Sequence, residues 1–400
     1  MIFLTWFLFA VHLFFTVKLG FVQKDVFKGI RYSFQNDCQG SGIGTYRAFA
    51  AALGTTIGPG NVVGVAVAIS LGGSGAVLWM WLSGVVAMAT KYAESYLCVK
   101  YKTTCGGTMV LLSQNGKGIL AFIWSVFCAA AGLFMGAAVP SNSLSASLNA
   151  PEWIVGFFLA LLTLVTVSFG FLGIASVSGL LVPVMSLAFT AFCLLGVFMN
   201  IELLPSAIAD MLKNAFLPSS FAGGGVGLAI KHGVTRGLYS NESGLGTGGV
   251  LAAEAGEKDA HKSALASMTT TFWDTVVMCA ITGVMFITCG AEKGMSVTDI
   301  LDISFSILPF GKVFLGISMS VFVFATIIGW YYIAKRVIGY YTKKSGFYDV
   351  LYILMVFVGS VAGTDFIWKI SDVINICLLL PSLYVILYMR SKIGLYISNK

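Results

Sequence analysis

Long apolar runs follow one another along almost the whole chain, separated by short polar or glycine- and proline-rich stretches. A membrane-spanning helix needs roughly 20 apolar residues, and eleven runs are predicted as spans on this criterion. Residues 23–44 carry Lys24, Lys28 and Arg31 among apolar positions, which is typical of a helix at the membrane surface. The predicted spans lie near residues 1–22, 45–70, 75–98, 117–140, 152–172, 178–200, 222–255, 263–290, 310–340, 349–367 and 369–390.

Two of these runs contain segments that disfavour a helix. Residues 54–61 read Gly-Thr-Thr-Ile-Gly-Pro-Gly-Asn, and Pro59 removes a backbone donor in the middle of the span. Residues 240–249 read Ser-Asn-Glu-Ser-Gly-Leu-Gly-Thr-Gly-Gly. Irregular backbone at this depth survives only where protein groups or a water-filled cavity satisfy its polar atoms. We therefore predict that both helices unwind and that the two breaks face one shared cavity.

The spacing of the breaks predicts an internal repeat. They lie in the second and seventh predicted spans, and this odd offset reverses the direction of the second broken helix. We expect a leading helix and surface segment (1–44) followed by two five-helix repeats of opposite orientation (45–200 and 201–400), an arrangement that many secondary transporters share. In that arrangement, free N–H groups at the broken ends bind an anionic substrate group and freed carbonyls bind a cation. The alternative is that each break is a packing kink made by small residues.

Composition supports the membrane assignment and excludes other classes. The 400 residues are 58% hydrophobic and 10% charged, with a mean hydropathy of +0.90, whereas an ordinary globular chain is about a quarter charged. The net charge of +7 is spread over loops between the predicted helices, so we expect no nucleic-acid partner. Paired catalytic carboxylates, a metal-binding helix motif and a Ser/His arrangement are absent from the sequence, so we predict neither an enzyme nor an organic cofactor.

The distribution of positive charge predicts an orientation. If every run crosses once, Lys and Arg fall on the two sides in a ratio of roughly four to one. Basic residues collect in cytoplasmic loops. We therefore predict a multi-pass protein of the plasma (inner) membrane with its N-terminus outside and its C-terminus in the cytoplasm.

Several motifs at and beyond the breaks carry a family resemblance. They are Gly-x-Gly-Asn at 58–61 with the Val-Gly-Val-Ala that follows, Leu-Gly-Gly-x-Gly-Ala-Val-x-Trp-Met-Trp at 71–81, Met-Ala-Thr-Lys-Tyr-Ala-Glu at 88–94, the stretch 233–244, Asp274-Thr275 with Cys279, and the stretches 324–330 and 368–381. Together they resemble the alanine or glycine:cation symporter family, sodium-coupled amino-acid carriers with the leucine-transporter fold. The resemblance covers about nine tenths of the chain.

The resemblance implies a substrate site among the first, third, sixth and eighth core helices, with a sodium ion nearby. Thr326 and Trp330 are four residues apart and so share one helix face. Sodium prefers oxygen ligands, and the candidates are Thr55, Thr56 and freed carbonyls around Gly58. The implied substrate-binding residues are Gly58, Gly60, Asn61, Asn142, Tyr239, Ser240, Asn241, Thr326 and Trp330.

The chain departs from the family pattern close to this inferred pocket. Pro59 stands where the family has Thr, Pro140 where it usually has a substrate-contacting Gln, and Arg47 where it often has Gln. Our leading hypothesis is sodium-coupled symport of a small neutral amino acid, such as alanine or glycine, by alternating access. The alternatives are a proton-coupled carrier of another small solute, and a transport-deficient channel or sensor of the same fold. The sequence does not specify the oligomeric state.

Ionisable residues inside the predicted spans each have two interpretations. Glu242 takes part in transport, or it is structural, pairing with Arg236 or capping the second half-helix. Asp274 and Asp372 are structural hydrogen-bonding groups or coupling sites. Arg47 extends to the membrane surface, or it supplies a fixed positive charge in place of a cation.

Overall fold

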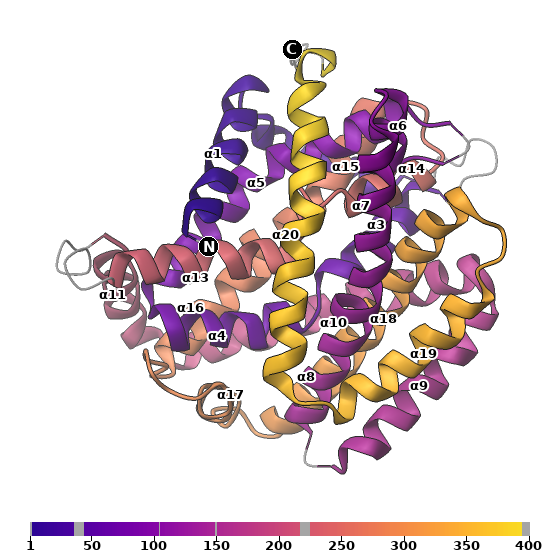
Figure 1. Ribbon diagram of the computed structural model, residues 1–400. Coiled ribbons are helices and arrows are strands. Elements are labelled where there is room, and N and C mark those ends of the chain that lie inside the picture. The colour runs from indigo at the N-terminus through magenta and orange to yellow at the C-terminus, as the bar shows by residue number, and fades with distance from the viewer. Residues whose placement is uncertain (1, 36–43, 104, 149, 217–224, 394–400) are drawn as a thin grey trace.

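The computed structural model describes residues 2–35, 44–103, 105–148, 150–216 and 225–393, and every regular element within these ranges is a helix (Figure 1). The leading segment holds α1 (Ile2–Lys18) and α2 (Val26–Ser33). The first half then contains α3 (Thr45–Thr56), α4 (Val63–Gly72), α5 (Gly75–Lys100), α6 (Thr108–Gln114), α7 (Gly118–Ala131), α8 (Val139–Ser147), α9 (Glu152–Ser168) and α10 (Gly170–Met199). The second half contains α11 (Leu204–Phe216), α13 (Gly225–Asn241), α14 (Thr247–Glu254), α15 (Ala260–Thr271), α16 (Ala280–Thr288), α17 (Val297–Phe305), α18 (Gly311–Tyr341), α19 (Gly346–Val361) and α20 (Thr364–Tyr388).

Each of the predicted apolar runs coincides with one helix or with two helices in succession. Six helices of the described part are long and apolar enough to cross a membrane, or up to eight if each bent pair is one span. α9 and α19 have 17 and 16 residues, which at 1.5 Å per residue fall short of the roughly 30 Å hydrocarbon core. The total of eleven spans therefore stays a prediction, while the all-helical membrane architecture is confirmed.

Several predicted boundaries are wrong. α19 ends at Val361 and α20 begins at Thr364, where 367 and 369 were predicted. Two further differences have an identifiable reason. α8 continues to Ser147, beyond the predicted end of the run at residue 140. The segment before it, η3 (Gly132–Ala138), is π-helical, and the altered hydrogen-bond spacing lets the helix pass a residue that has no N–H. α10 begins at Gly170 rather than 178, because a single turn at Phe169 and the positive φ of Gly170 (69°) suffice to reverse the chain.

A short amphipathic helix, α2, occupies part of the segment predicted to lie at the membrane surface. It packs against α15, and a Cβ at Gly29 would lie 2.5 Å from the Leu265 carbonyl oxygen. Its opposite face exposes Phe27. Residues 36–43, the rest of the predicted surface segment, fall outside the described residues.

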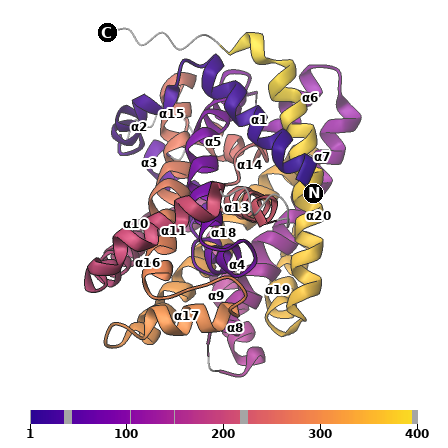
Figure 2. The same ribbon diagram turned by 90° about the vertical axis from the view of Figure 1, so that its left-hand side faces the viewer.

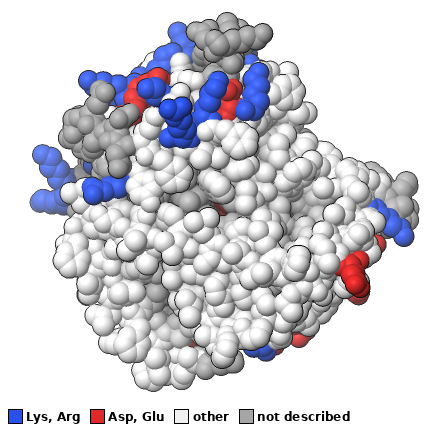
Figure 3. Space-filling view, turned by 180° about the vertical axis from the view of Figure 1, so that it is seen from behind, with Lys and Arg blue, Asp and Glu red and all other residues white. Residues whose placement is uncertain are grey.

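The surface has the distribution that a bilayer requires. Large apolar side chains project outward and are more than half exposed, among them Leu180, Leu187 and Phe198 on α10 and Phe366 and Val373 on α20. Figure 3 shows Lys and Arg gathered at the end of the molecule where α20 ends, above a wide area without charge. Apolar surface of this extent exceeds what soluble monomers expose. The protein is therefore a multi-pass membrane protein.

The two halves interlock around α5, which passes through the middle of the molecule (Figures 1 and 2). α5 is the helix after the first broken helix, and it packs against α13 and α14 of the second. The helix after the second broken helix is α15, which continues through the π-helical segment η5 (Phe272–Cys279) into α16. The continuous helix formed by α15, η5 and α16 packs against the first broken helix, α3 and α4. The helix that follows each break thus packs against the broken helix of the other half.

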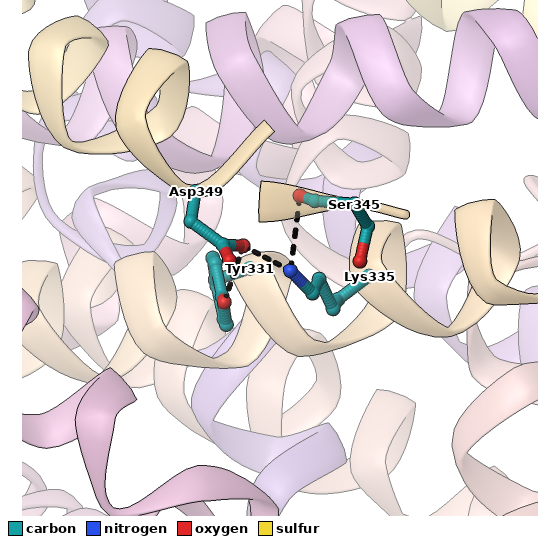
Figure 4. A network of polar contacts seen from close by, with 4 residues as sticks. All are labelled: Tyr331, Lys335, Ser345 and Asp349. Carbon is teal, nitrogen blue, oxygen red and sulfur yellow. Dashed lines mark hydrogen bonds and ion pairs between the residues drawn. The ribbon is translucent and has the colours of Figure 1, made fainter. Parts of the chain in front are cut away.

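A polar network joins α18 to α19 at the turn between them (Figure 4). The Lys335 ammonium forms an ion pair with the Asp349 carboxylate, and the Tyr331 hydroxyl donates to the same carboxylate at 2.7 Å. Lys335 also donates to the Ser345 carbonyl at 3.1 Å. Because the Lys335 and Asp349 side chains are partly exposed, their ion pair fixes the turn without a large desolvation penalty.

Candidate functional site

The first break has the predicted interruption. α3 ends at Thr56 and the chain bends by 54° before it continues as α4. Gly58 is extended, and Pro59 begins a single 3₁₀ turn, a position where its missing N–H is tolerated. The Asn61 side-chain oxygen accepts the Gly58 N–H at 2.9 Å. Because residue 59 has no N–H, the Thr55 carbonyl cannot receive its helical hydrogen bond.

The second break is confirmed as well. α13 ends at Asn241, whose side-chain oxygen accepts the Ser243 N–H at 3.0 Å. Three left-handed residues follow: Glu242 (φ 54°), Gly244 (φ 92°) and Gly246 (φ 91°). Glycine adopts this conformation freely, whereas a glutamate in it is strained by about 1–3 kcal/mol. Strain of this kind persists where the surrounding structure imposes it, which marks Glu242 as a functional candidate.

The two breaks meet deep inside the protein. A Cβ at Gly60 would lie 3.4 Å from the Ser240 Cα. Asp274, from η5, joins them: its carboxylate accepts the Asn61 amide at 2.7 Å and the Ser240 hydroxyl at 2.9 Å. Thr275 donates to the same carboxylate at 2.6 Å. The structural interpretation of Asp274 therefore has direct support, since the contacts with Asn61 and Ser240 hold the breaks together.

Both breaks line one buried cavity of about 20 Å³, as the sequence predicts. This volume has room for one or two water molecules, so the cavity is narrow. The residues that line it are Thr55, Thr56, Gly58, Pro59, Gly60, Met135, Val139, Pro140, Tyr239, Ser240, Glu242, Thr326 and Trp330.

α18 forms one wall of this cavity through Thr326 and Trp330, which line it together. The Thr326 hydroxyl donates to the Gly54 carbonyl at 3.2 Å, and a Cβ at Gly58 would lie only 2.5 Å from that hydroxyl oxygen. Trp330 is buried. A Cβ at Gly136 in η3 would lie 2.3 Å from the Trp330 Cβ. Glycine is thus required at 58 and 136 for helices to approach this closely.

Three of the residues predicted to bind substrate lie away from the cavity lining. Asn61 donates to Asp274, and Asn241 caps the second break with its own side chain. Asn142 donates to the Gly359 and Ala362 carbonyls at 3.3 and 2.9 Å. In all three, the amide holds the backbone of a break or a helix end.

The candidate sodium ligands are grouped at the end of α3. The Thr55 and Thr56 hydroxyls both donate to carbonyls of the preceding turn, at 2.8 Å for Thr55. A donating hydroxyl keeps lone pairs for a cation, and both residues border the cavity with Gly58. Within the described residues no group of three His, Cys, Asp or Glu side chains suits a metal ion.

The charged residues considered from the sequence have different surroundings. Glu242 accepts the Thr247 hydroxyl at 2.9 Å. This contact joins two side chains, and no side-chain hydrogen bond caps α14, so the capping interpretation finds no support. It forms no ion pair with Arg236 within the described structure. The Arg236 guanidinium instead lies 4.9 Å from the centre of the Trp368 ring. Arg47 is exposed on α3, so it does not supply a fixed charge at the cavity.

Sequence reasoning missed two buried charges on α5. The Glu94 carboxylate accepts the N–H groups of Gly244 and Gly249, and the Lys91 ammonium donates to the Asn241 carbonyl. The signal was available, because ionisable residues inside an apolar run usually have a function. Both residues lie within the run at 75–98, three positions apart.

Comparison with known proteins identifies related chains and the fold. A family model described as the sodium:alanine symporter family matches residues 1–398. The sodium/alanine symporter AgcS of Methanococcus maripaludis is 33% identical over 95% of this chain and 90% of its own. The amino-acid carrier protein AlsT of Bacillus subtilis is 30% identical over 96% and 86%. The crystal structure of MhsT in complex with L-phenylalanine aligns with a TM-score of 0.63 at 15% identity, covering 86% of this chain and 88% of that one, and so shares the fold.

Proposed function

The chain belongs to the sodium:alanine symporter family, and from that membership we propose that it carries a small neutral amino acid of the alanine or glycine class together with sodium. Membership makes it a membrane transporter rather than an enzyme. Sodium coupling and the substrate class are the proposed part. Transport by alternating access requires a site near the middle of the membrane that opens to each side in turn.

The observation that carries this proposal is the single cavity at which both breaks meet. The N-terminal end of α4 presents N–H groups and the positive end of its dipole near Gly60, which favours a carboxylate. The Glu242 carboxylate and the Ser240 hydroxyl, also in the lining, offer oxygen atoms to an ammonium group. Trp330 forms part of the lining, and its bulk favours a small side chain. We therefore assign the zwitterion of a small amino acid to this cavity, which has to widen from its volume of about 20 Å³ for the solute to enter.

Sodium is proposed to bind beside the substrate, at the oxygens of Thr55, Thr56 and Gly58. The Thr55 carbonyl is freed by Pro59, as described above, and a freed carbonyl with nearby hydroxyls suits a hard monovalent cation. Thr326, whose hydroxyl approaches Gly58, lies close enough to join this group. Binding there would fix the end of α3 against α18 and so couple the ion to the conformation.

A proton-coupled carrier is the second candidate, and the buried carboxylic groups of Glu242 and Asp274 favour it. Glu242 lines the cavity and Asp274 contacts both breaks. A carboxylate that takes up a proton could link transport to a proton gradient in the way that sodium binding would.

Uptake by the protein reconstituted in liposomes tests these alternatives. Labelled alanine, glycine and serine are offered under an imposed sodium gradient, an imposed proton gradient, or neither. We expect saturable uptake and counterflow of at least one of these solutes under the sodium gradient alone. Uptake driven only by protons would reject the sodium assignment, and binding without uptake would indicate a sensor.

The orientation is proposed from charge. Lys and Arg gather at the end of the molecule where α20 ends (Figure 3), and basic residues favour the cytoplasmic side. We therefore place the C-terminus in the cytoplasm and the N-terminus outside. Labelling of a cysteine introduced near residue 392 should require a reagent that enters the cell.

A further inference from the structure

One turn of α5 contacts both ends of the second break. Lys91 and Glu94 project from it, and both are buried with at most 1% of their surface exposed. The helix packs along α13 before the break and along α14 after it. Neither side chain lines the cavity assigned to the substrate. Two buried charges of opposite sign thus lie at this break, outside the site already described.

Glu94 occupies the N–H end of the break. One carboxylate oxygen accepts the Gly244 N–H at 3.1 Å and the other accepts the Gly249 N–H at 2.9 Å. The start of a helix leaves such N–H groups without backbone partners, and its dipole favours a negative charge there. In broken transporter helices these are the groups that bind an anionic ligand. The Glu94 carboxylate therefore takes the place that a ligand carboxylate would take.

Lys91 occupies the carbonyl end of the same break. Its ammonium donates to the carbonyl of Asn241, the last residue of α13, at 3.4 Å. A Cβ at Gly248 would lie 2.5 Å from the ammonium nitrogen, so glycine at this position makes room for it. The carbonyl end of a helix carries the negative end of its dipole and attracts a cation.

The ammonium also interacts with three carboxylic groups rather than with one. It is in electrostatic range of Glu94, Glu242 and Asp274, yet none of the described ion pairs includes it. A buried charge without a close partner is unfavourable unless its whole surroundings favour that charge. The Lys91 ammonium is surrounded by the carbonyl end of a helix and by several acidic side chains, and both favour a positive charge.

We propose that Lys91 and Glu94 together act as a built-in substitute for a zwitterionic ligand in the second break. The ammonium fills the cation position and the carboxylate fills the anion position. The carboxylate of the transported amino acid then binds at the N–H groups of the first break, near Gly60, which fixes its orientation in the cavity. The orientation rests on the proposed function, whereas the filling of the second break by the two side chains does not.

Chemical rescue tests the proposal on the full-length protein. Lys91→Ala and Glu94→Ala each remove one charge and leave its space. Each is expected to lower alanine uptake about tenfold or more, since a hydrogen bond to a charged group contributes that much. Methylammonium should restore uptake and thermal stability to Lys91→Ala, and formate should restore them to Glu94→Ala. Neither ion should affect wild type, or the control variants Lys100→Ala and Glu152→Ala at exposed positions.

Absence of rescue, or equal rescue of a variant by both ions, would overturn the proposal. Lys91→Met and Glu94→Gln fill the same space without charge and are expected to insert into the membrane but to transport poorly. If either transports at the wild-type rate, the charges are dispensable and the proposal is wrong, whether or not the alanine variants fold. The two proposals can fail separately. If methylammonium stabilises Lys91→Ala and formate stabilises Glu94→Ala, but the wild-type protein takes up no amino acid, this inference stands and the proposed function is rejected.

Discussion

Asn61 donates its side-chain amide to the carboxylate of Asp274, 213 residues further along the chain, at 2.7 Å. Asn61 belongs to the first break and Asp274 to the helix that follows the second. The Ser240 hydroxyl of the second break donates to the same carboxylate. One buried acid therefore fixes the two breaks relative to each other and shapes the cavity between them.

Replacing this acid should release both breaks. Asp274→Ala removes the carboxylate that accepts the Asn61 amide and the Ser240 hydroxyl. Asn61 keeps the backbone carbonyl of residue 274, at 3.1 Å, and each buried hydrogen bond that is lost without replacement costs about 1–3 kcal/mol. We expect a lower unfolding temperature in detergent and loss of amino-acid binding, measured by thermal denaturation and by equilibrium binding of labelled alanine. Asp302→Ala removes an exposed carboxylate that pairs with Lys312 and should change neither. Unaltered binding by Asp274→Ala would remove this acid from the account.

Gly58 is required by its approach to Thr326. Gly58→Ala would place a Cβ 2.5 Å from the Thr326 hydroxyl oxygen, so α18 has to move away from the first break, and uptake should fall by about tenfold or more. Adding Thr326→Ala removes the clashing oxygen and should recover part of the folding stability. Gly64→Ala on α4, where a Cβ meets nothing within 4 Å, is the matched control. Wild-type uptake by Gly58→Ala would show that the contact has no role.

Trp330 should limit the size of the transported solute. Trp330→Ala enlarges the cavity on the side of Met135 and Val139, so larger neutral amino acids should compete better for uptake of labelled alanine. The truncation should also destabilise the protein by about 3–5 kcal/mol, as expected for a buried tryptophan. Trp153→Ala, at a position on α9 that is 61% exposed, should leave the ranking of competitors unchanged. The same ranking in Trp330→Ala would argue against a pocket role.

The strain at Glu242 predicts opposite effects on stability and on transport. Glu242→Gly relieves the left-handed conformation, worth about 1 kcal/mol or more, but removes the carboxylate from the cavity. We expect a higher or unchanged unfolding temperature together with reduced uptake. Phe310 is the control, since it has φ 61° and is exposed in a loop: Phe310→Gly should gain stability without losing uptake. Full uptake by Glu242→Gly would exclude a transport role for the carboxylate.

Local composition was sufficient to predict both breaks. Glycine and proline at 58–60 and the closely spaced glycines from 244 onward favour an interruption of a helix, because proline lacks an N–H and glycine adopts non-helical conformations freely. The shared face of Thr326 and Trp330 follows from helical periodicity. These features depend on residues close in the sequence, which is why they could be recognised before the structure.

Partners that lie far apart in the sequence were not predictable in the same way. The sequence shows that Asn61 and Asn142 are polar inside an apolar span, but only the packing shows that one meets Asp274 and the other meets the end of α19. The π-helical segment that carries Asp274 has no marker in composition, because it depends on how the whole helix packs. Polar residues in spans thus indicate a role without identifying it.

The contact between Gly60 and Ser240 offers the most direct test that the two breaks enclose the transport site. A Cβ at Gly60 would lie 3.5 Å from the Ser240 Cβ, within the range that a disulfide requires, about 3.5–4.5 Å. The double variant Gly60→Cys with Ser240→Cys is made in protein that carries Cys279→Ala, because Cys279 is adjacent to Ser240. Its disulfide is followed by mass spectrometry, and uptake of labelled alanine is measured before and after reduction. We predict that the disulfide forms, that bound alanine slows its formation, and that uptake is absent when oxidised and returns in part on reduction. Failure to cross-link, or full uptake by the cross-linked protein, would contradict the account.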